Sequence, residues 1–196
     1  MREMRMAVRG AGLVLAAALA GGAGAQEAQD GASPAEAPPQ AAGASENRVA
    51  VATDWSVFVE TDPALECWGV SVPTSTRNTR EGEEVEVLRG DILLFVAHRP
   101  SASVAGEVSF TGGYPFADDS TVTMQIGPDR FEMFTRGEFA WPVSTEDDAR
   151  IVAAMRRGRE VVLTGRSSRG TQTEDTFSLM GFTAAMEELE GNCTAS

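Results

Sequence analysis

The sequence predicts an all-β fold, an antiparallel β-sandwich or jelly-roll-like domain with one or two short helices and one disulfide bond. Short apolar or alternating segments recur between turns that contain glycine or proline, and this spacing is typical of sandwiches and barrels. Only one longer segment has clear helical periodicity. Two cysteines, Cys67 and Cys193, lie near the two ends of the region that contains these segments.

The strand signal is either alternation with a period of two or a continuous apolar run bounded by turn residues. Residues 84–87 alternate between glutamate and valine, which predicts a strand with one exposed and one buried face. Residues 92–96 are continuously apolar, as expected for a central strand. The predicted strands are residues 55–59, 65–72, 84–87, 92–96, 107–110, 121–126, 131–134, 139–141, 161–165 and 176–180.

One helix is predicted to begin after Ser144 or Thr145 and to end before Gly158. Either residue can cap the helix, because an aspartate follows three residues later and completes a capping box. Acidic residues in the first turn and arginines in the last turn favour the helix dipole, and glycine is the usual residue after a helix end. A second short helix is predicted at residues 184–189.

Cys67 and Cys193 are the only cysteines, and an even pair in an oxidising compartment predicts a disulfide bond. The second helix would bring Cys193 back toward Cys67. The alternative is a nucleophilic cysteine served by His98, the lone histidine, but no catalytic motif surrounds either residue. We therefore expect the disulfide.

The N-terminal 25 residues have the pattern of a secretory signal peptide. Arginines precede the apolar residues 11–20, which are too few for a stable membrane span, and Ala23-Gly24-Ala25 resembles a cleavage site. Residues 26–50, rich in alanine and proline, are expected to form a disordered spacer before a single domain at 51–196. The mature protein is thus expected in the periplasm or outside the cell by the general secretory route, with no membrane anchor.

The formal net charge is −13, and all 16 basic residues are arginine. Nucleic-acid binding and peripheral binding to anionic lipid both need a basic face, so this charge argues against both. A cationic partner, or solubility alone, fits the acidic balance better.

No catalytic, cofactor-binding or metal-binding residues are predicted. The acidic residues 81–86 lack the ligand pattern of a calcium loop, and one histidine does not make a usual zinc site. His98 lies near serines, but the chain has no nucleophile-elbow motif. His98 or an acid pair remains the weak candidate base of a periplasmic hydrolase.

Two further features are weak candidates for binding. Arg89-Gly90-Asp91 is an adhesion-type tripeptide, although its place between two predicted strands also suits a tight connection. Trp55, Trp68 and Trp141 could line a binding groove for a partner or small ligand, although tryptophans are more often core anchors.

Several of these segments, in this order, resemble the invasion-associated locus B family. They are Asp54-Trp55-Ser56-Val57, then Cys67, then residues 89–96, and the later residues 165–170 up to Phe182. The resemblance covers about residues 54–193. It implies a small exported all-β protein of the bacterial envelope, in a family named for entry into host cells, and it supplies no catalytic residues. Family members often have a cysteine where this chain has Val59.

These observations together predict an exported, non-catalytic envelope protein that acts by protein or surface recognition, in host association or envelope maintenance. Its partner would be an unknown envelope or host protein. A periplasmic hydrolase and a small-ligand carrier remain as alternatives.

Overall fold

The computed structural model describes residues 47–193, so the predicted signal peptide and most of the predicted spacer lie outside the described residues. One 12-stranded antiparallel sheet contains every strand of this part of the chain, and 3-10 helix η1 (Pro100–Ala102) separates two of them. The strands are β1 (Arg48–Ala52), β2 (Trp55–Glu60), β3 (Glu66–Ser71), β4 (Ser75–Arg80), β5 (Glu83–Glu84), β6 (Leu93–Arg99), β7 (Val104–Thr111), β8 (Thr121–Ile126), β9 (Asp129–Arg136), β10 (Phe139–Pro142), β11 (Glu160–Arg166) and β12 (Gln172–Ser178).

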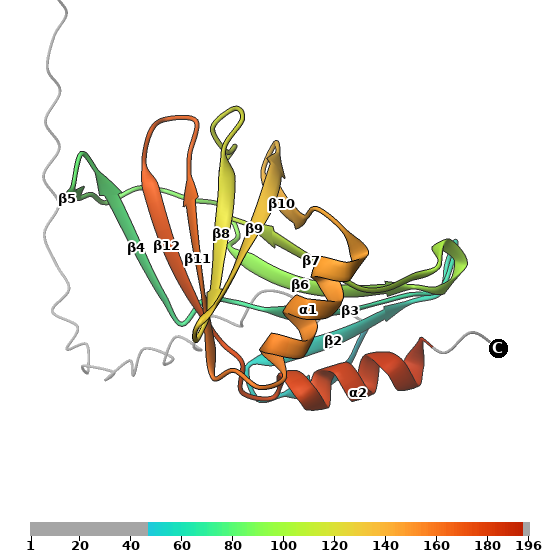
Figure 1. The fold of residues 1–196 in the computed structure, drawn as a ribbon. Helices are drawn as coiled ribbons and strands as arrows, with labels where there is room; N and C mark the ends of the chain where they lie inside the picture. The colour runs from blue at the N-terminus through green and yellow to red at the C-terminus, as the bar shows by residue number, and fades with distance from the viewer. Residues whose placement is uncertain (1–46, 194–196) are drawn as a thin grey trace, which may run out of the picture. The chain divides into compact units, whose positions relative to one another are not determined.

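The sheet has two halves whose strands run in different directions (Figure 1). One half has the order β1-β2-β3-β6-β7, and the other has the order β10-β9-β8-β11-β12-β4-β5. A short antiparallel pairing joins the halves, with Phe110 of β7 opposite Ala140 of β10. The antiparallel all-β class predicted from the sequence is confirmed. The two layers expected of a sandwich are here the two halves of one continuous sheet.

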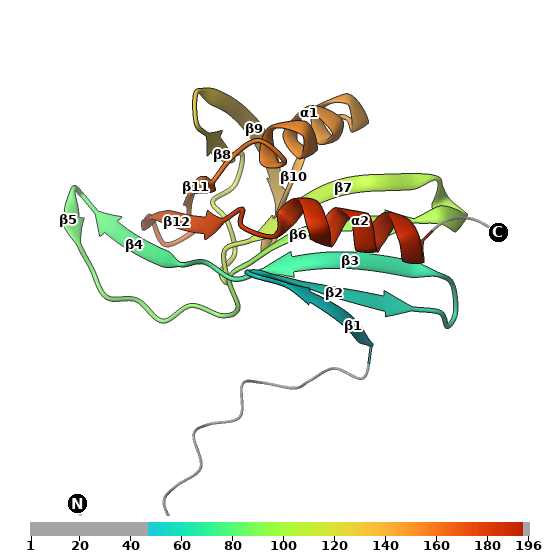
Figure 2. The same cartoon turned by 90° about the horizontal axis from the view of Figure 1, so that it is seen from below.

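Most predicted strands are present, with three differences. The strand predicted at 84–87 is wrong beyond Glu84, because residues 85–92 form no strand on their way from β5 to β6, and Figure 2 shows them alongside β4. The strand predicted at 176–180 ends at Ser178 and begins earlier, at Gln172. The sequence did not predict β1 or β4, and β1 begins three residues before the domain boundary expected at Val51.

The hydrophobic core lies on the inner faces of the two halves. Residues of β7 and β12 meet there, where the rings of Phe110 and Phe177 lie 6.1 Å apart in an edge-to-face contact. Trp55 of β2 is 1% exposed and its ring is 4.9 Å from that of Phe182. Aromatic contacts of this kind add to the free energy gained from burying apolar area.

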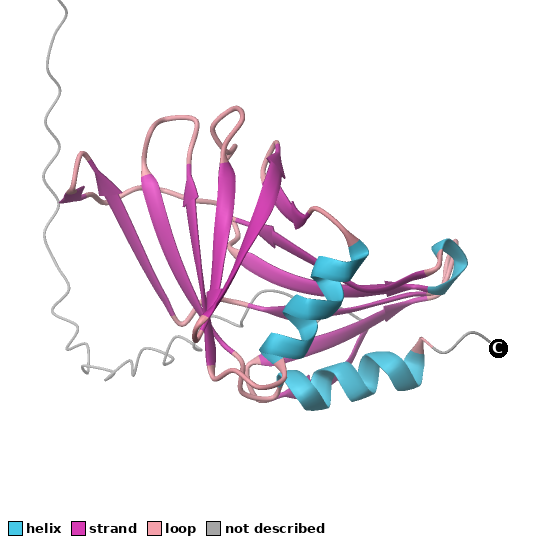
Figure 3. Ribbon diagram, viewed as in Figure 1, coloured by secondary structure: helices cyan, strands magenta, loops and turns pink. Residues whose placement is uncertain are grey.

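Both helices pack on the inner face, as Figure 3 shows for the helices drawn in cyan. Helix α1 (Thr145–Met155) begins after Ser144, whose Oγ accepts a hydrogen bond of 3.1 Å from Asp147 N, so the predicted cap is confirmed. It packs against β7, where Asp148 accepts a 2.8 Å hydrogen bond from Val108 N. Helix α2 (Phe182–Asn192) packs against β1, β2 and β3.

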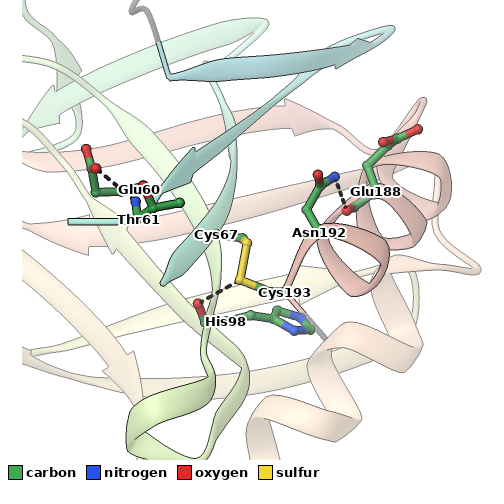
Figure 4. The surroundings of a disulfide bond; sticks show 7 residues. All are labelled: Glu60, Thr61, Cys67, His98, Glu188, Asn192 and Cys193. Carbon is green, nitrogen blue, oxygen red and sulfur yellow. Dashed lines mark hydrogen bonds between the residues drawn. A yellow bond between two sulfur atoms is a disulfide. The ribbon is translucent and has the colours of Figure 1, made fainter. Parts of the chain in front are cut away.

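A disulfide between Cys67 of β3 and Cys193, at the end of α2, confirms the predicted pairing (Figure 4). The two Cα atoms are 6.0 Å apart, within the usual range for a disulfide. The bond attaches α2 to the centre of the first half of the sheet. Among the described residues, no helix is long and apolar enough to cross a membrane.

Candidate recognition surface

The outer face of the sheet carries aromatic side chains across strands β2, β3, β6, β10 and β9. Side chains alternate between the two faces of a strand, and the buried set on each strand points to the inner face. The outer set includes six aromatic residues, which we call the aromatic face: Phe58, Trp68, Phe95, Phe134, Phe139 and Trp141. Neither helix packs on this side of the sheet, so these rings remain partly exposed.

Cross-strand pairing brings these rings together. Phe58 lies opposite Trp68, and their rings are 5.6 Å apart and nearly parallel. On the other half of the sheet, the ring of Trp141 is 5.7 Å from each of Phe134 and Phe139. Phe134 and Phe139 are 41% and 39% exposed, which is high for large apolar side chains.

Two shallow hollows connect the aromatic residues. One, of about 280 Å³, is lined by Trp68, Phe95 and Phe139, so it joins the aromatic residues of both halves. The other, of about 380 Å³, is lined by Trp141, Phe134 and the segment that leads into α1. Glu107 lines both hollows, so they lie next to each other on one surface.

Charged groups border the aromatic face. Arg99 forms a 2.7 Å ion pair with Glu107 and lies 4.0 Å from Glu66. Asp148, at the start of α1, lines the larger of the two hollows. Burial raises the pKa of Asp148, and its hydrogen bond from Val108 N opposes this shift.

The three candidate tryptophans do not form one groove. Trp55 belongs to the core, where its Nε1 donates a 3.1 Å hydrogen bond to Ser178 O. Trp68 and Trp141 lie on the aromatic face, on opposite sides of the junction between the halves. The four phenylalanines of this face were not singled out from the sequence. Their positions in period-two strands are a usable signal, but the register that aligns them is not visible in the sequence.

The candidate adhesion tripeptide is held inside the domain by its arginine. The side chain of Arg89 is 6% exposed and that of Asp175 is 0% exposed, and two hydrogen bonds of 2.7 and 2.6 Å join the guanidinium to the carboxylate. Arg89 also donates to Gly112 O and to Asn78 Oδ1. Binding residues of this kind act from exposed loops, whereas the side chain of Arg89 is buried against Asp175, so Arg89 has a structural role here.

Two motifs that carry the family resemblance meet at this point. Arg89 and the turn between β11 and β12, which contains Ser167 and Arg169, line one cleft of about 540 Å³. Tyr114 lies between them, with Arg89 5.0 Å above its ring and its hydroxyl 2.5 Å from Thr173 Oγ1. Burial raises the pKa of Tyr114 to about 12.

Comparison with known protein families gives a match over the second half of the domain. Residues 120–190 match the family model described as invasion associated locus B (IalB) protein. The resemblance to the IalB family is confirmed. No curated protein and no solved structure matched the chain. The IalB match begins just before β8 and ends within α2, and it contains Phe134, Phe139 and Trp141 of the aromatic face.

The IalB match does not contain His98, and this residue is buried. His98 is 9% exposed, its Nε2 has no hydrogen-bond partner, and burial lowers its pKa while Glu190 opposes that shift. Its carbonyl oxygen lies 3.8 Å from Cys193 Sγ (Figure 4). The structure therefore places His98 against the disulfide, and His98 lines neither of the two hollows described above.

Residues 47–193 contain no group of three histidine, cysteine, aspartate or glutamate side chains that could hold a metal ion.

Proposed function

We propose that this chain is an exported, non-catalytic envelope protein of the IalB type, and that it binds a protein partner through the aromatic face. The observation that carries this proposal is the gathering of six aromatic side chains on a side of the sheet that neither helix covers. Tryptophan, other aromatic residues and arginine dominate the binding energy of protein interfaces. A partner could therefore gain much of its affinity from Trp68 and Trp141.

The charge at one end of the aromatic face indicates what kind of partner it would bind. The end of the aromatic face at the β2–β3 hairpin has four acidic residues, Glu60, Asp62, Glu66 and Glu107, and two arginines, Arg99 and Arg48, the latter opposite Phe58. The local balance of −4 + 2 = −2 has the same sign as the net charge of the chain. Complementary charge steers association and selects partners. We therefore expect basic residues on the part of the partner that approaches this end.

Export is part of the proposal. Residues 1–25 carry the signal-peptide pattern, and the Cys67–Cys193 disulfide is of a kind that persists in oxidising compartments. The IalB match is compatible with a protein outside the cytoplasm. Residues 26–46 would then separate the signal from the domain, and the mature protein would act in the periplasm or outside the cell.

Site-specific photo-cross-linking in the cells that produce the protein tests this function. A photoreactive phenylalanine derivative at position 139 or 134 should give a covalent adduct with one protein. The same derivative at position 180 is the control, because Met180 is 58% exposed but lies after β12 and not on the aromatic face.

The adduct at position 139 should disappear when Trp141 is changed to alanine, because Trp141 packs beside Phe139. Adducts of equal yield from position 180 would show that contact does not depend on the aromatic face. A protein that stays monomeric and gives no adduct from positions 134 and 139 would contradict the proposal.

A further inference from the structure

A second candidate binding surface lies beside β4, at the opposite edge of the sheet from β1. Residues 85–92, which we call the strap, connect β5 to β6 and form no strand. Their first residues nonetheless alternate in the way of a strand, with Val85 and Val87 partly buried and Glu86 exposed. A conflict of this kind between local pattern and fold is more frequent at functional sites than elsewhere.

The strap and β4 diverge and leave a hollow between them. This hollow, which we call the β4 wedge, has a volume of about 730 Å³ and is lined on one side by Thr76, Arg77 and Asn78 of β4 and on the other by residues 84–88. Figure 2 shows the strap running beside β4 on its way to β6. The volume is within the range of sites that bind ligands.

The register shows which backbone groups face the wedge. Thr79 pairs with Glu84, and Val85 N donates a 3.0 Å hydrogen bond to Asn78 O, so the groups of Asn78 point toward the strap. Backbone groups of alternate residues in an antiparallel strand point the same way. The N–H and C=O of Thr76, two residues from Asn78, therefore point into the wedge, where a continued ladder would have placed Val87.

The strap cannot complete this ladder, because its far end is fixed elsewhere. Arg89 is held by Asp175, and Gly90 N donates a 2.8 Å hydrogen bond to Gly113 O. A Cβ on Gly113 would lie 2.5 Å from Gly90 O, so the two backbones are in close contact. Leu88, between the two fixed ends, is fully exposed. The same contacts that bury Arg89 thus keep the strap away from Thr76.

We infer that the β4 wedge accepts an extended polypeptide segment, which adds to the sheet at the edge of β4 and carries basic side chains. Strand addition uses unpaired edge groups for affinity and alternate side chains for specificity. Among the charged groups that line the wedge, Arg77 and Glu84 pair with each other at 2.8 Å, which leaves the negative charge of Glu86 unbalanced. Charge complementarity therefore favours arginine or lysine in the segment. This inference is independent of the aromatic face and of its partner.

The test uses a synthetic peptide of about six residues, a common strand length, in which arginine and valine alternate. A second peptide has glutamate in place of arginine. Binding to the purified protein is measured by fluorescence polarisation, and amide hydrogen exchange reports on Thr76 and Val87. In the free protein both amides should exchange rapidly, and the arginine peptide should slow the exchange of Thr76.

Two variants locate the binding. Thr76→Pro removes the N–H of Thr76, which faces the wedge, a change that an edge strand tolerates because no ladder bond is lost. Glu86→Arg reverses a charge on the strap. Each should weaken binding of the arginine peptide at least about tenfold, which is about 1.4 kcal/mol. Glu83→Arg, on β5 but outside the wedge, is the matched control and should bind like the unchanged protein.

Four results would overturn the inference. The first two are slow amide exchange of Thr76 in the free protein, and no saturable binding of the arginine peptide up to about 1 mM. The third is a glutamate peptide that binds as tightly as the arginine peptide. The fourth is that Thr76→Pro and Glu86→Arg both bind the arginine peptide as tightly as the unchanged protein does. Concentration-dependent dimerisation that Thr76→Pro abolishes would assign the wedge to a second copy of this chain. If Thr76→Pro does not fold, Glu86→Arg and its Glu83→Arg control still decide the outcome.

Discussion

Replacement of Arg89 by methionine should destabilise the domain strongly, because it leaves the carboxylate of Asp175 buried without its partner. Asp175 is 0% exposed, and both of its oxygens accept hydrogen bonds from Arg89. Breaking a buried pair in this way costs about 3–5 kcal/mol. The carbonyl of Gly112 also loses its 2.8 Å donor, at a further cost of about 1–3 kcal/mol. The total approaches the whole stability of an ordinary domain, about 5–15 kcal/mol.

Urea denaturation, followed by tryptophan fluorescence, measures this loss. The double variant Arg89→Met/Asp175→Leu should recover at least about 2 kcal/mol relative to Arg89→Met, because an apolar pair has no unpaired charge to bury. Arg77→Met is the control, since it breaks an ion pair with Glu84 in which both side chains are mostly exposed, and exposed pairs contribute little. Two results would contradict this prediction: a loss from Arg89→Met no larger than that from Arg77→Met, or a double variant as unstable as the two single variants added together.

Three further predictions concern buried groups. Replacement of both Cys67 and Cys193 by serine should lower the free energy of unfolding by up to about 5 kcal/mol, because the bond closes a loop of 126 residues; a loss near zero in urea titrations would contradict this. His98 has a lowered pKa in the folded state, so the unfolded chain binds its proton first and stability should fall as the pH drops below about 6.5. His98→Asn should reduce this slope between about pH 7.5 and 5, and an unchanged slope would assign it to other groups. Tyr114 is the chain's single tyrosine, so absorbance at alkaline pH reports it alone and should show a pKa of about 12 in the folded protein, with stability falling as the pH rises from about 10 toward 12. A midpoint near 10 before unfolding would show that Tyr114 is solvated.

The strand pattern of the fold could be predicted where one face of a strand is buried. Residues 121–126 alternate between polar and apolar side chains, and β8 has these bounds. The polar strand β4 (Ser75–Arg80) was missed because its six side chains are all polar and mostly exposed, so no alternation marks it. β1 was missed because its alanines and valines continue an alanine-rich segment. β4 is defined by pairing with β12, which lies far along the chain, whereas β1 pairs with the adjacent strand β2.

The strap shows the opposite error. Residues 84–87 have the local pattern of a strand, yet only Glu83–Glu84 is paired. The reason lies in Arg89 and Asp175, which are 86 residues apart in the sequence and whose contact draws the strap away from β4. The alternating pattern of residues 84–87 says nothing about this distant contact, so it could not show that the strand ends at Glu84. The disulfide could be predicted because only one pairing of two cysteines exists.

The aromatic face depends on the junction between the two halves of the sheet. Phe58, Trp68 and Phe95 belong to the half before residue 120, and the other three aromatic residues belong to the IalB match. The two sets come together because β7 and β10 pair over only two positions, Thr111 with Phe139 and Phe110 with Ala140. Ala140 is fully buried there, so a larger side chain would force the strands apart. A surface that needs both halves can recognise a partner only in the folded domain, and the short β7–β10 pairing is the point at which that recognition is most easily lost.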